Sequence, residues 1–422
     1  MEDHESHNPN DIAMEINEML EKAEPLFKDK CCIYRVPHEI RSSNADAYTP
    51  RVVSIGPFHR GDQKLLKMED QKRIFCRKLI ERSETNLESL VTCVQELEPE
   101  VRSSYSDEIK LGVDDHVRVI FVDCCFILEL LLRFHFNGCI ALFPWLDEYI
   151  RWDLLLLENQ LPFFVFEKIY NLAFATTLNG DTDHPSFLTL ILRFYEFDND
   201  NDHDWDSARI AHFTDLLRTF HLKQSRSTHS RKDKTLPFIK SAIQLHEAGV
   251  KFKVNKSSRC ILDLQFSGHT LEIPKIQLDD ETEIRLRNMV ALEQCHYPDK
   301  SYITDYTLVL DWLINTHKDV DFLVDRGIII NWLGDSKAVA KLFNGLEKNI
   351  ILETSNAEYF RICKDLNDFC KHPWNRKVAT LRRDYCNTPW KTVASVAGIA
   401  LLIFTIIQTV CSILQVVQGS SK

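Results

Sequence analysis

The last 30 residues of the chain contain one long apolar run. From Val393 to Val417 the sequence reads VASVAGIALLIFTIIQTVCSILQVV and carries no charged residue. At about 1.5 Å of rise per residue, a helix of this length crosses a hydrocarbon core of about 30 Å with some tilt. We therefore predict a membrane span at 393–417 rather than a buried helix of a soluble domain. Five positions mark its course: Val393, Gly398, Leu402, Phe404 and Val417.

The charges around this run predict its orientation. Six basic residues and the single acid Asp384 precede the run between positions 371 and 391, whereas Lys422 alone follows it. The positive-inside rule therefore places the body of the chain in the cytosol. The same residues could contact anionic lipid headgroups, or they could form an ordinary solvated helix face. This basic collar consists of Lys371, Arg376, Lys377, Arg382, Arg383 and Lys391.

Composition narrows the location and the class of partner. The opening sequence MEDHESHNPN lacks the basic and apolar regions of a signal peptide. Many of the 13 cysteines lie in apolar runs, which is typical of buried thiols in a reduced compartment. The net charge is −11, and an acidic body argues against nucleic-acid binding, which needs a basic surface. We expect a protein of the plasma membrane or an endomembrane with its body in the cytosol.

Apolar periodicity predicts a mainly helical body. Within the N-terminal tail, residues 1–30, one face of an amphipathic helix carries Ile12, Ile16, Met19 and Leu20. The body itself is expected over residues 31–390. Its run 117–134 is nearly as apolar as the C-terminal run but contains four charged residues, so it predicts a core helix and not a second span. Two of those charges, Glu129 and Arg133, have the spacing of an i,i+4 ion pair.

Two segments depart from the helical pattern. Residues 250–274 alternate apolar and polar side chains around the turn Ser267-Gly268-His269, which predicts a small antiparallel sheet of two or three strands. Residues 197–234 are the most polar stretch, broken by a short apolar patch around Phe213 to Leu222, and are expected to form an exposed excursion. The predicted fold class is therefore mainly α (α+β): a large helical body with a small antiparallel β insert and one C-terminal transmembrane helix.

A series of motifs runs in order along nearly the whole chain. They are IYRVPHEIR, AYTPRVVSIGPFHRG and KMEDQK (within 33–72), VDCCFILELL (122–131), RWDLLLLENQLPFFVFEKIY (151–170), HEAGVKF (246–252), LRNMVALEQC (286–295), NWLGDSKAVAKLFN (331–344) and YCNTPW (385–390). Together with the apolar tail, this series resembles the plant "domain of unknown function 247" family (DUF-247).

Some positions differ from the usual family pattern. Phe58 and Arg60 stand where Tyr and a second His are usual, Cys124 replaces a usual Gly, and Cys386 replaces a usual Phe. None of these changes should undo the fold, although the missing His weakens the case for a histidine-based site in that motif.

The resemblance implies a plant-restricted, membrane-associated protein. The family has no established enzymatic activity and no agreed catalytic residues, so the resemblance supplies no functional residues. Some members are associated with recognition at the pollen–stigma surface of self-incompatible grasses. The resemblance thus favours interaction or signalling over catalysis.

The residues themselves contain no familiar catalytic or nucleotide-binding motif. Neither G-x-G-x-x-G nor G-x-x-x-x-G-K-[ST] occurs, and these are the glycine-rich loops that bind phosphates. Cys363, Cys370, His372 and Cys386 could in principle bind zinc, but their spacing matches no known zinc motif and fits buried helical cysteines better. We therefore expect no catalytic, cofactor-binding or metal-binding residues and no small-molecule cofactor.

Four polar residues interrupt a strongly apolar run: Asp153, Glu158, Asn159 and Gln160. In a core such groups must find hydrogen-bond partners or cost free energy. We expect them to bind the neighbouring Pro-rich segment, residues 33–61, in a structural role. The alternative is a carboxylate pair for acid–base chemistry, for which a raised pKa of Glu158 would be the sign.

These features predict a single-pass plant membrane protein of uncharacterised activity that acts in protein interaction, signalling or recognition and is not an enzyme. Its expected partners are the lipid bilayer and a protein that the sequence does not identify. One alternative is a membrane-bound hydrolase or transferase that uses the acidic residues around 153–160. The other is a recognition protein of the self-incompatibility type, with its body outside the cell.

Overall fold

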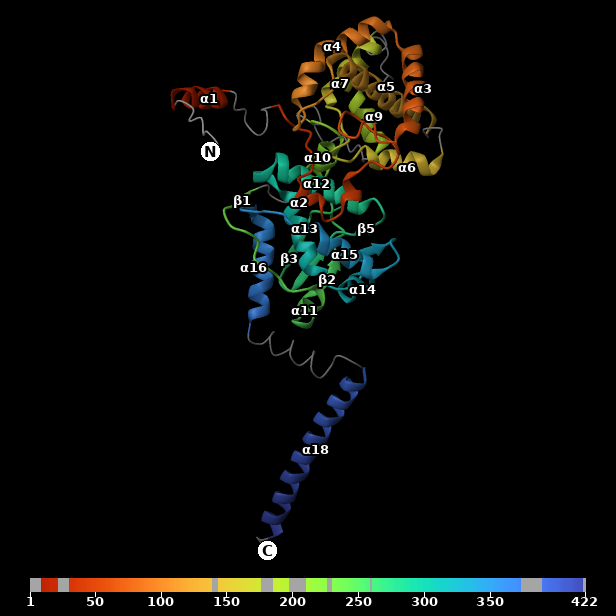
Figure 1. Ribbon diagram of the computed structural model, residues 1–422. Helices are drawn as coiled ribbons and strands as arrows, with labels where there is room; N and C mark the ends of the chain where they lie inside the picture. The colour runs from red at the N-terminus through yellow and green to blue at the C-terminus, as the bar shows by residue number, and fades with distance from the viewer. Residues whose placement is uncertain are drawn as a thin grey trace. The chain divides into compact units, whose positions relative to one another are not determined.

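The chain is mainly helical and divides into two compact units (Figure 1). The computed structural model describes residues 9–21, 30–138, 143–175, 185–196, 210–225, 230–258, 260–372 and 389–419. Unit 1 comprises Met1–Pro37 and Tyr48–Leu216, and unit 2 comprises His38–Ala47 and Leu217–Lys422. Helices dominate the described residues and small sheets accompany them, which confirms the predicted fold class.

Unit 1 is built from helices in the part that the structure describes. They are α1 (Pro9–Glu21), α3 (Leu66–Arg82), α4 (Leu87–Ser103), α5 (Val113–Asn137), α6 (Pro144–Asp153), α7 (Phe163–Ala173) and α9 (Phe187–Phe194). Two further elements cross the boundary between the units along the chain, η1 (Ala45–Tyr48) and α10 (Phe213–Gln224).

Helix α5 forms the centre of the unit 1 core. It packs against α3, α4, α7 and α9, and the side chains from Val117 to Leu132 are almost all buried (Figure 1). The helix ends at Gly138, whose φ of 71° places it in the left-handed region that favours glycine at a helix C-terminus. Glu129 and Arg133 form the expected i,i+4 pair, with Arg133 Nε 2.8 Å from the carboxylate. The prediction of a charged core helix is therefore confirmed.

Unit 2 combines helices with short strands. Its described helices are α2 (His38–Arg41), α11 (Ala242–Glu247), α12 (Thr282–His296), η2 (Pro298–Lys300), α13 (Tyr302–Leu313), α14 (His317–Asp325), α15 (Ser336–Leu346), α16 (Ala357–Lys371) and α18 (Pro389–Gly419). Its described strands are β1 (Arg231–Lys232), β2 (Lys251–Val254), β3 (Gln265–Ser267), β4 (Thr270–Ile273), β5 (Ile276–Leu278), β6 (Ile329–Asn331) and β7 (Ser355–Asn356).

The predicted β insert is present, but its strand directions differ in part from the expectation. Strands β3 and β4 form the antiparallel hairpin, with Gly268 at a φ of 61° in the turn. Strand β2, however, pairs with β4 in parallel, so the sheet has the order β2-β4-β3 and is mixed. Alternation of apolar side chains is the same for both strand directions, and for this reason the sequence pattern could not distinguish them.

The polar stretch 197–234 is not exposed throughout. Residues 197–209 and 226–229 lie outside the described residues, but 210–225 contain α10, and Phe213, Leu216 and Leu217 of that helix are buried. The apolar positions of α10 override the polar composition around them, and this correction applies to the described part of the stretch.

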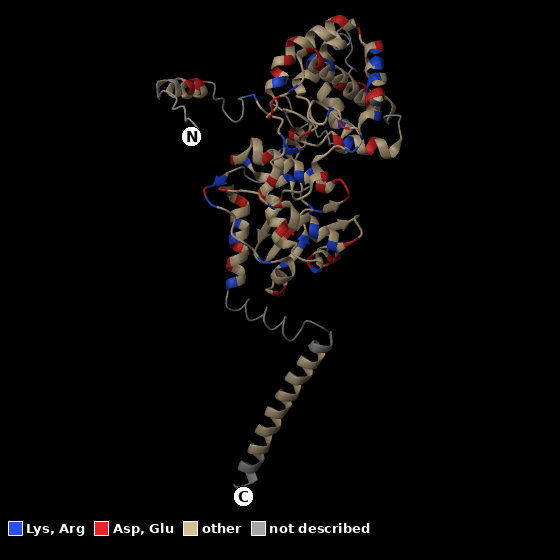
Figure 2. Cartoon of the chain, in the orientation of Figure 1, with Lys and Arg blue, Asp and Glu red and all other residues tan. Residues whose placement is uncertain are grey.

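The C-terminal helix α18 combines a long apolar sequence with exposure along that sequence. Its residues Val393–Leu414 have a mean hydropathy of 2.3, and the apolar window is not buried against the protein. Figure 2 shows charged residues over both units but none along the described side chains of α18. Among the described residues, this is the helix that is long and apolar enough to cross a membrane.

Candidate functional site

The buried polar residues of unit 1 hold one extended segment, residues 51–56. The Asp153 carboxylate, at the end of α6, accepts hydrogen bonds from the backbone N–H groups of Arg51, Val52 and Val53 at 2.8, 2.7 and 2.9 Å. Burial raises the pKa of Asp153 to about 6, although these three hydrogen bonds act to lower it. The carboxylate thus replaces the partner strand that this segment lacks.

Asn159 and Asp123 continue the same pattern along the segment. Asn159 accepts a hydrogen bond from the N–H of Ile55 at 2.7 Å and donates to the carbonyl of Val53 at 3.0 Å. The carboxylate of Asp123, on α5, accepts the N–H of Gly56 at 2.9 Å. These polar side chains therefore fix the backbone of the segment by contacts that are more than 60 residues apart in the sequence.

The side chain of Gln160 also forms its hydrogen bonds with the main chain. Its amide nitrogen donates to the carbonyls of Leu154 and Leu156 at 2.6 and 2.7 Å, and its oxygen accepts the N–H of Phe213 at 3.0 Å. The backbone carbonyl of Gln160 leaves no room for a side chain at Gly56, because a Cβ at Gly56 would lie 2.6 Å from the carbonyl oxygen. Gly56 also has a φ of 71°, so both space and backbone conformation require glycine.

Glu158 is the member of the set that faces other ionisable groups. One carboxylate oxygen accepts the N–H of Val36 at 2.9 Å, while the other lies 3.2 Å from His59 Nε2 and 3.6 Å from Arg35 Nη1. Arg35 also pairs with Asp107 at 3.1 Å. The site thus joins a buried carboxylate to an imidazole and a half-exposed guanidinium.

A surface pocket of about 610 Å³ lies beside this group. Arg35, Phe58, Arg60, Asp107 and Lys110 are among its lining residues. The Arg35 guanidinium lies 4.5 Å from the centre of the Phe58 ring, a cation–π distance that fixes the side chain at the pocket wall. The pocket therefore combines both signs of charge with one aromatic face.

A buried ion pair that the sequence did not reveal supports segment 51–56 from the other side. Lys72, on α3, is 1% exposed, and its ammonium lies 2.6 Å from Asp123, 2.6 Å from Glu69 and 2.7 Å from the carbonyl of Ser54. Burial raises the pKa of Asp123, and the Lys72 charge opposes that rise. Both residues lie within the quoted motifs, but no spacing rule connects positions 51 residues apart.

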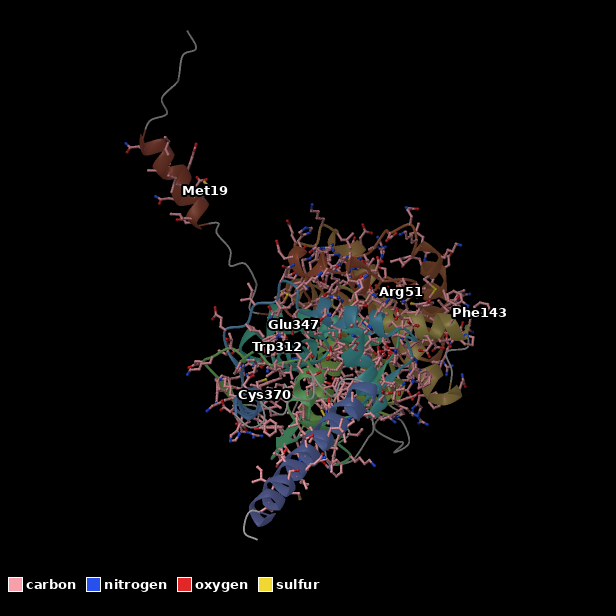
Figure 3. The ribbon with its side chains drawn as sticks, turned by 90° about the horizontal axis from the view of Figure 1, so that it is seen from below. Met19, Arg51, Phe143, Trp312, Glu347 and Cys370 are labelled. Carbon is pink, nitrogen blue, oxygen red and sulfur yellow. The ribbon has the colours of Figure 1, made fainter. Side chains whose placement is uncertain are left out.

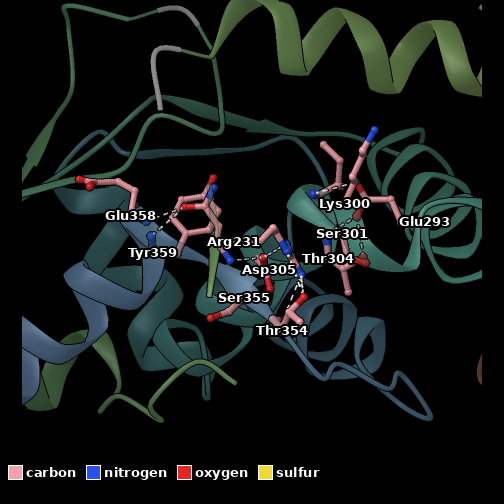
Figure 4. Close-up of polar contacts among 12 residues, drawn as sticks. Arg231, Glu293, Lys300, Ser301, Thr304, Asp305, Thr354, Ser355, Glu358 and Tyr359 are labelled. Atoms are coloured by element: carbon pink, nitrogen blue, oxygen red, sulfur yellow. Dashed lines mark hydrogen bonds and ion pairs between the residues drawn. The ribbon is translucent and has the colours of Figure 1, made fainter. Parts of the chain in front are cut away.

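Unit 2 contains a second buried network, which Figure 4 shows. Glu293, on α12, is fully buried and accepts a hydrogen bond from Arg218 Nε at 2.9 Å. It also accepts the N–H of Ile303 at 3.1 Å and both the N–H and the hydroxyl of Thr304 at 2.8 and 2.7 Å. Arg218 donates further to the carbonyl of Lys300 at 2.7 Å. This one carboxylate therefore holds the first turn of α13 and an arginine from α10.

Asp305 anchors the neighbouring sheet of β1 and β7. Its carboxylate accepts hydrogen bonds from Arg231 Nη1 at 2.6 Å and from the N–H of Asn356 at 2.8 Å (Figure 4). Arg231 reaches the carbonyl of Thr354 at 3.0 Å as well. Burial raises the pKa of Asp305 to about 7, and Arg231 acts to lower it. The polar stretch of sequence around position 231 thus contains an arginine with a structural role.

Two carboxyl groups of unit 2, those of Glu347 and Asp311, lie next to each other. Burial is the main cause that raises the pKa of Glu347 to about 9 and that of Asp311 to about 6, and the negative charge of Asp311 raises the Glu347 pKa further. Glu347, labelled in Figure 3, therefore keeps its proton to higher pH than an ordinary glutamate does. Like charges in a desolvated site favour this neutral form.

The remaining residues singled out in the sequence lie as follows. In α18, the marker residues Val393, Gly398, Leu402 and Phe404 are exposed, and the backbone at Val417 is helical. Of the basic collar, Lys371 is exposed at the end of α16, and Lys391 lies in α18 with its side chain not described. The others lie outside the described residues: Arg376, Lys377, Arg382 and Arg383.

The cysteines that the structure describes carry free thiols, and most of them are buried. Cys363 and Cys370 lie on the buried face of α16, where burial raises the pKa of both thiols. Cys386 lies outside the described residues. Within the described ranges, no group of three or more His, Cys, Asp or Glu side chains is arranged to hold a metal ion.

Comparison with known proteins identifies the family. The family model for a plant protein of unknown function, DUF247, matches residues 33–404. The chain belongs to the DUF247 family. This agrees with the resemblance carried by the motifs between positions 33 and 390. No solved structure matches this DUF247 chain.

Two curated relatives come from Arabidopsis thaliana. The UPF0481 protein At3g47200 is 31% identical to this DUF247 chain, over 93% of the chain and 88% of the relative. The putative UPF0481 protein At3g02645 is 24% identical, over 89% of each. The likeness therefore extends over both units, and the printed names of these relatives state no activity.

Proposed function

We propose that this DUF247 chain is a single-pass membrane protein whose cytosolic body recognises another protein. The exposed apolar helix α18 carries the proposal. A 22-residue helix, Val393–Leu414, with a mean hydropathy of 2.3 and no burial against the protein would be strongly unfavourable in water. A hydrocarbon core of about 30 Å accommodates a helix of this length.

The charge on the two sides of α18 supports the cytosolic orientation. The basic collar precedes the helix, whereas Lys422 is the one charged residue of the sequence after it. Lysine and arginine near a span favour the cytosolic side. The acidic body is consistent with a protein partner and not with nucleic acid.

An exposed aromatic patch on unit 1 supports the recognition role. Phe143 and Trp145 are 63% and 58% exposed, and their rings stack at 6.4 Å. Tyr149 and Trp152 continue the row, with Trp145 to Tyr149 at 6.1 Å and Tyr149 to Trp152 at 5.0 Å. The Arg51 guanidinium lies over both of these rings at 5.6 and 5.4 Å. Trp, Tyr and Arg are the residues most enriched where protein interfaces concentrate their binding energy.

The hydrogen bonds of the polar cluster favour recognition over catalysis. Asp153, Asn159 and Gln160 direct their side chains to the main chain of unit 1, and Glu158 uses one oxygen in the same way. A hydrolase or transferase of the alternative kind would need such a carboxylate to reach a substrate. We therefore assign the cluster a structural role and assign no cofactor to the protein.

Topology is the first test of this function. Glycosylation tags placed before Met1 and after Lys422 should report opposite sides of microsomal membranes, with sugar on the C-terminal tag. Alkaline carbonate should leave the chain in the membrane, whereas Leu402→Arg with Phe404→Arg should release much of it. Each arginine near the helix centre costs about 2.5–3.5 kcal/mol of insertion free energy.

The outcomes separate the hypotheses. Sugar on the N-terminal tag would replace this proposal by the extracellular recognition role, and extraction of the wild type by carbonate would reject the span. The sequence contains one N-glycosylation sequon, Asn255-Lys256-Ser257. It is a poor reporter of topology, because Asn255 is 2% exposed and its amide donates to the carbonyl of Asp263 at 3.0 Å.

The aromatic patch provides the test of recognition. In plant membranes, a protein partner that binds this patch should cross-link to the full chain. The double variant Phe143→Ser with Trp145→Ser should lower the yield of that cross-linked product at least tenfold. Val113→Ser is the matched control, because Val113 of unit 1 is 59% exposed and lies on a different helix. Identical cross-linked sets for the wild type and both variants would reject this patch as the binding surface.

A further inference from the structure

The last turn of α16 is the part of unit 2 that leads into the membrane anchor. Asn367 donates to the carbonyl of Phe238 at 2.8 Å, which holds the segment before α11 against this turn. The Phe369 ring lies 6.2 Å from that of Phe266 on β3, and a Cβ at Gly249 would lie 3.8 Å from it. The segment 236–249 and the sheet of β2, β3 and β4 therefore belong to the same end of unit 2.

An aromatic pair is exposed at this end. Phe238 is 69% exposed, although its neighbour Ile239 is fully buried, and its ring meets that of Trp312 edge-on at 5.4 Å. Trp312 is itself partly exposed. Two large rings are thus presented next to the turn from which the chain continues to α18.

Lysines surround the aromatic pair. Lys240 is exposed and close enough to Cys370 to lower the pKa of that thiol against the stronger effect of burial. Lys251 and Lys253 share the exposed face of β2, an edge strand of its sheet. Lys371 is the last residue of α16. The acids at this end are Glu247, Asp368 and Glu272, which lies opposite Lys253 on β4, so four lysines face three acids.

The covalent path to α18 limits how far this end can lie from the membrane. Seventeen residue steps separate His372 from Pro389, and a fully extended chain covers about 3.5 Å per step, or about 60 Å in total. The residues between them include four basic residues and one acid, Asp384, so the connection itself has a net positive charge. Any surface near its start is therefore held at high effective concentration beside the bilayer.

We propose that this end of unit 2 binds an anionic bilayer surface, with Phe238 and Trp312 in the headgroup region and the lysines on lipid phosphates and carboxylates. We call it the tether face and define it by Phe238, Lys240, Lys251, Lys253, Trp312 and Lys371. The inference rests on the membrane anchoring proposed above. Aromatic rings with an apolar body favour the membrane–water interface, and lysine favours anionic lipid.

The covalent connection to α18 favours a lipid surface over a protein as the ligand of the tether face. Unit 2 is never more than one connection length from the bilayer, and the cytosolic leaflet carries a negative surface potential. A lysine near such a surface strengthens binding about fivefold. The face combines several such lysines with exposed rings, so it is complementary to the surface that lies nearest to it.

Photo-cross-linking of the full chain to lipid tests the tether face. The wild type is placed in nanodiscs that contain photoactivatable phosphatidylserine, and adducts are mapped to peptides. We expect adducts in residues 236–241 and 249–254 as well as in 393–414. Lys240→Ala, Lys251→Ala and Lys253→Ala together should reduce the first two by at least tenfold and leave the third unchanged.

A matched triple variant controls for net charge. It removes three exposed lysines of unit 2 that lie within α15 or just after it: Lys337→Ala, Lys341→Ala and Lys348→Ala. This variant should leave the yield of every lipid adduct unchanged. Adducts at 393–414 without any at 236–254 would overturn the tether face while leaving the anchor intact. Loss of adducts at 393–414 would instead reject the anchor. Equal labelling from photoactivatable phosphatidylcholine, with no effect of the lysine variant, would also overturn the inference.

Discussion

Lys72→Met is expected to lower the free energy of unfolding of unit 1 by about 3–5 kcal/mol. The ammonium of Lys72 is buried and lies 2.6 Å from Asp123 and 2.7 Å from the carbonyl of Ser54. Removing it leaves the Asp123 carboxylate without a countercharge in a desolvated site. The midpoint of thermal unfolding of the full chain in detergent should fall by about 10 °C.

Two further variants make this expectation specific. Lys78→Met is the control on the same helix, because its ammonium pairs with Glu81 at 2.6 Å and is half exposed, so the loss should stay below about 1 kcal/mol. Lys72→Met with Asp123→Asn should recover part of the lost stability, since no buried charge remains. If Lys72→Met and Lys78→Met lower the free energy of unfolding equally, the buried Lys72–Asp123 pair contributes no more to stability than an exposed pair does.

The Lys72→Met defect should also depend on pH in a stated direction. Burial already raises the pKa of Asp123, and Lys72 is the leading group that lowers it. Without the lysine the folded-state pKa rises further above its unfolded value of about 3.9. The protonated acid is tolerated in the core, so the defect should be smallest at acid pH and should grow as the pH rises through the folded-state pKa. Unfolding midpoints at several pH values measure this.

Local patterns predicted the elements that depend on near neighbours. The run 117–134 was assigned to the core because charges such as Glu129 and Arg133 interrupt it, and that pair forms one helical turn apart. The apolar run after Val393 forms a single long helix, as its length and lack of charge predicted without reference to any distant residue. The hairpin of β3 and β4 followed from alternation around Gly268.

Contacts between distant residues could not be derived in this way. The sequence marked Asp153 and Asn159 as costly in a core, but it did not show which N–H groups they would bind across about 100 residues. The parallel pairing of β2 with β4 and the two-residue pairing of β1 with β7 depend equally on the folded chain. Arg231 looked like part of a solvated charged stretch until Asp305 was found beside it.

The same reasoning explains where a single substitution should damage unit 2 most. Glu293→Ala is expected to lower its free energy of unfolding by about 3–5 kcal/mol, because it leaves the nearly buried guanidinium of Arg218 without its carboxylate. It also removes the acceptor for the N–H groups of Ile303 and Thr304 at the start of α13. Thermal unfolding and hydrogen exchange of the full chain measure the loss.

Asp299→Ala provides the comparison for Glu293→Ala, since Asp299 is an exposed acid in η2, close in the sequence, and its loss should cost less than about 0.5 kcal/mol. Glu293→Gln should fall between them, because the amide keeps one acceptor oxygen but loses the charge that Arg218 requires. Exchange should accelerate most over residues 297–304, which Glu293 and Arg218 hold together. A Glu293→Ala protein as stable as Asp299→Ala would mean that water replaces this network without cost, and the carboxylate would then have to be explained by binding and not by folding.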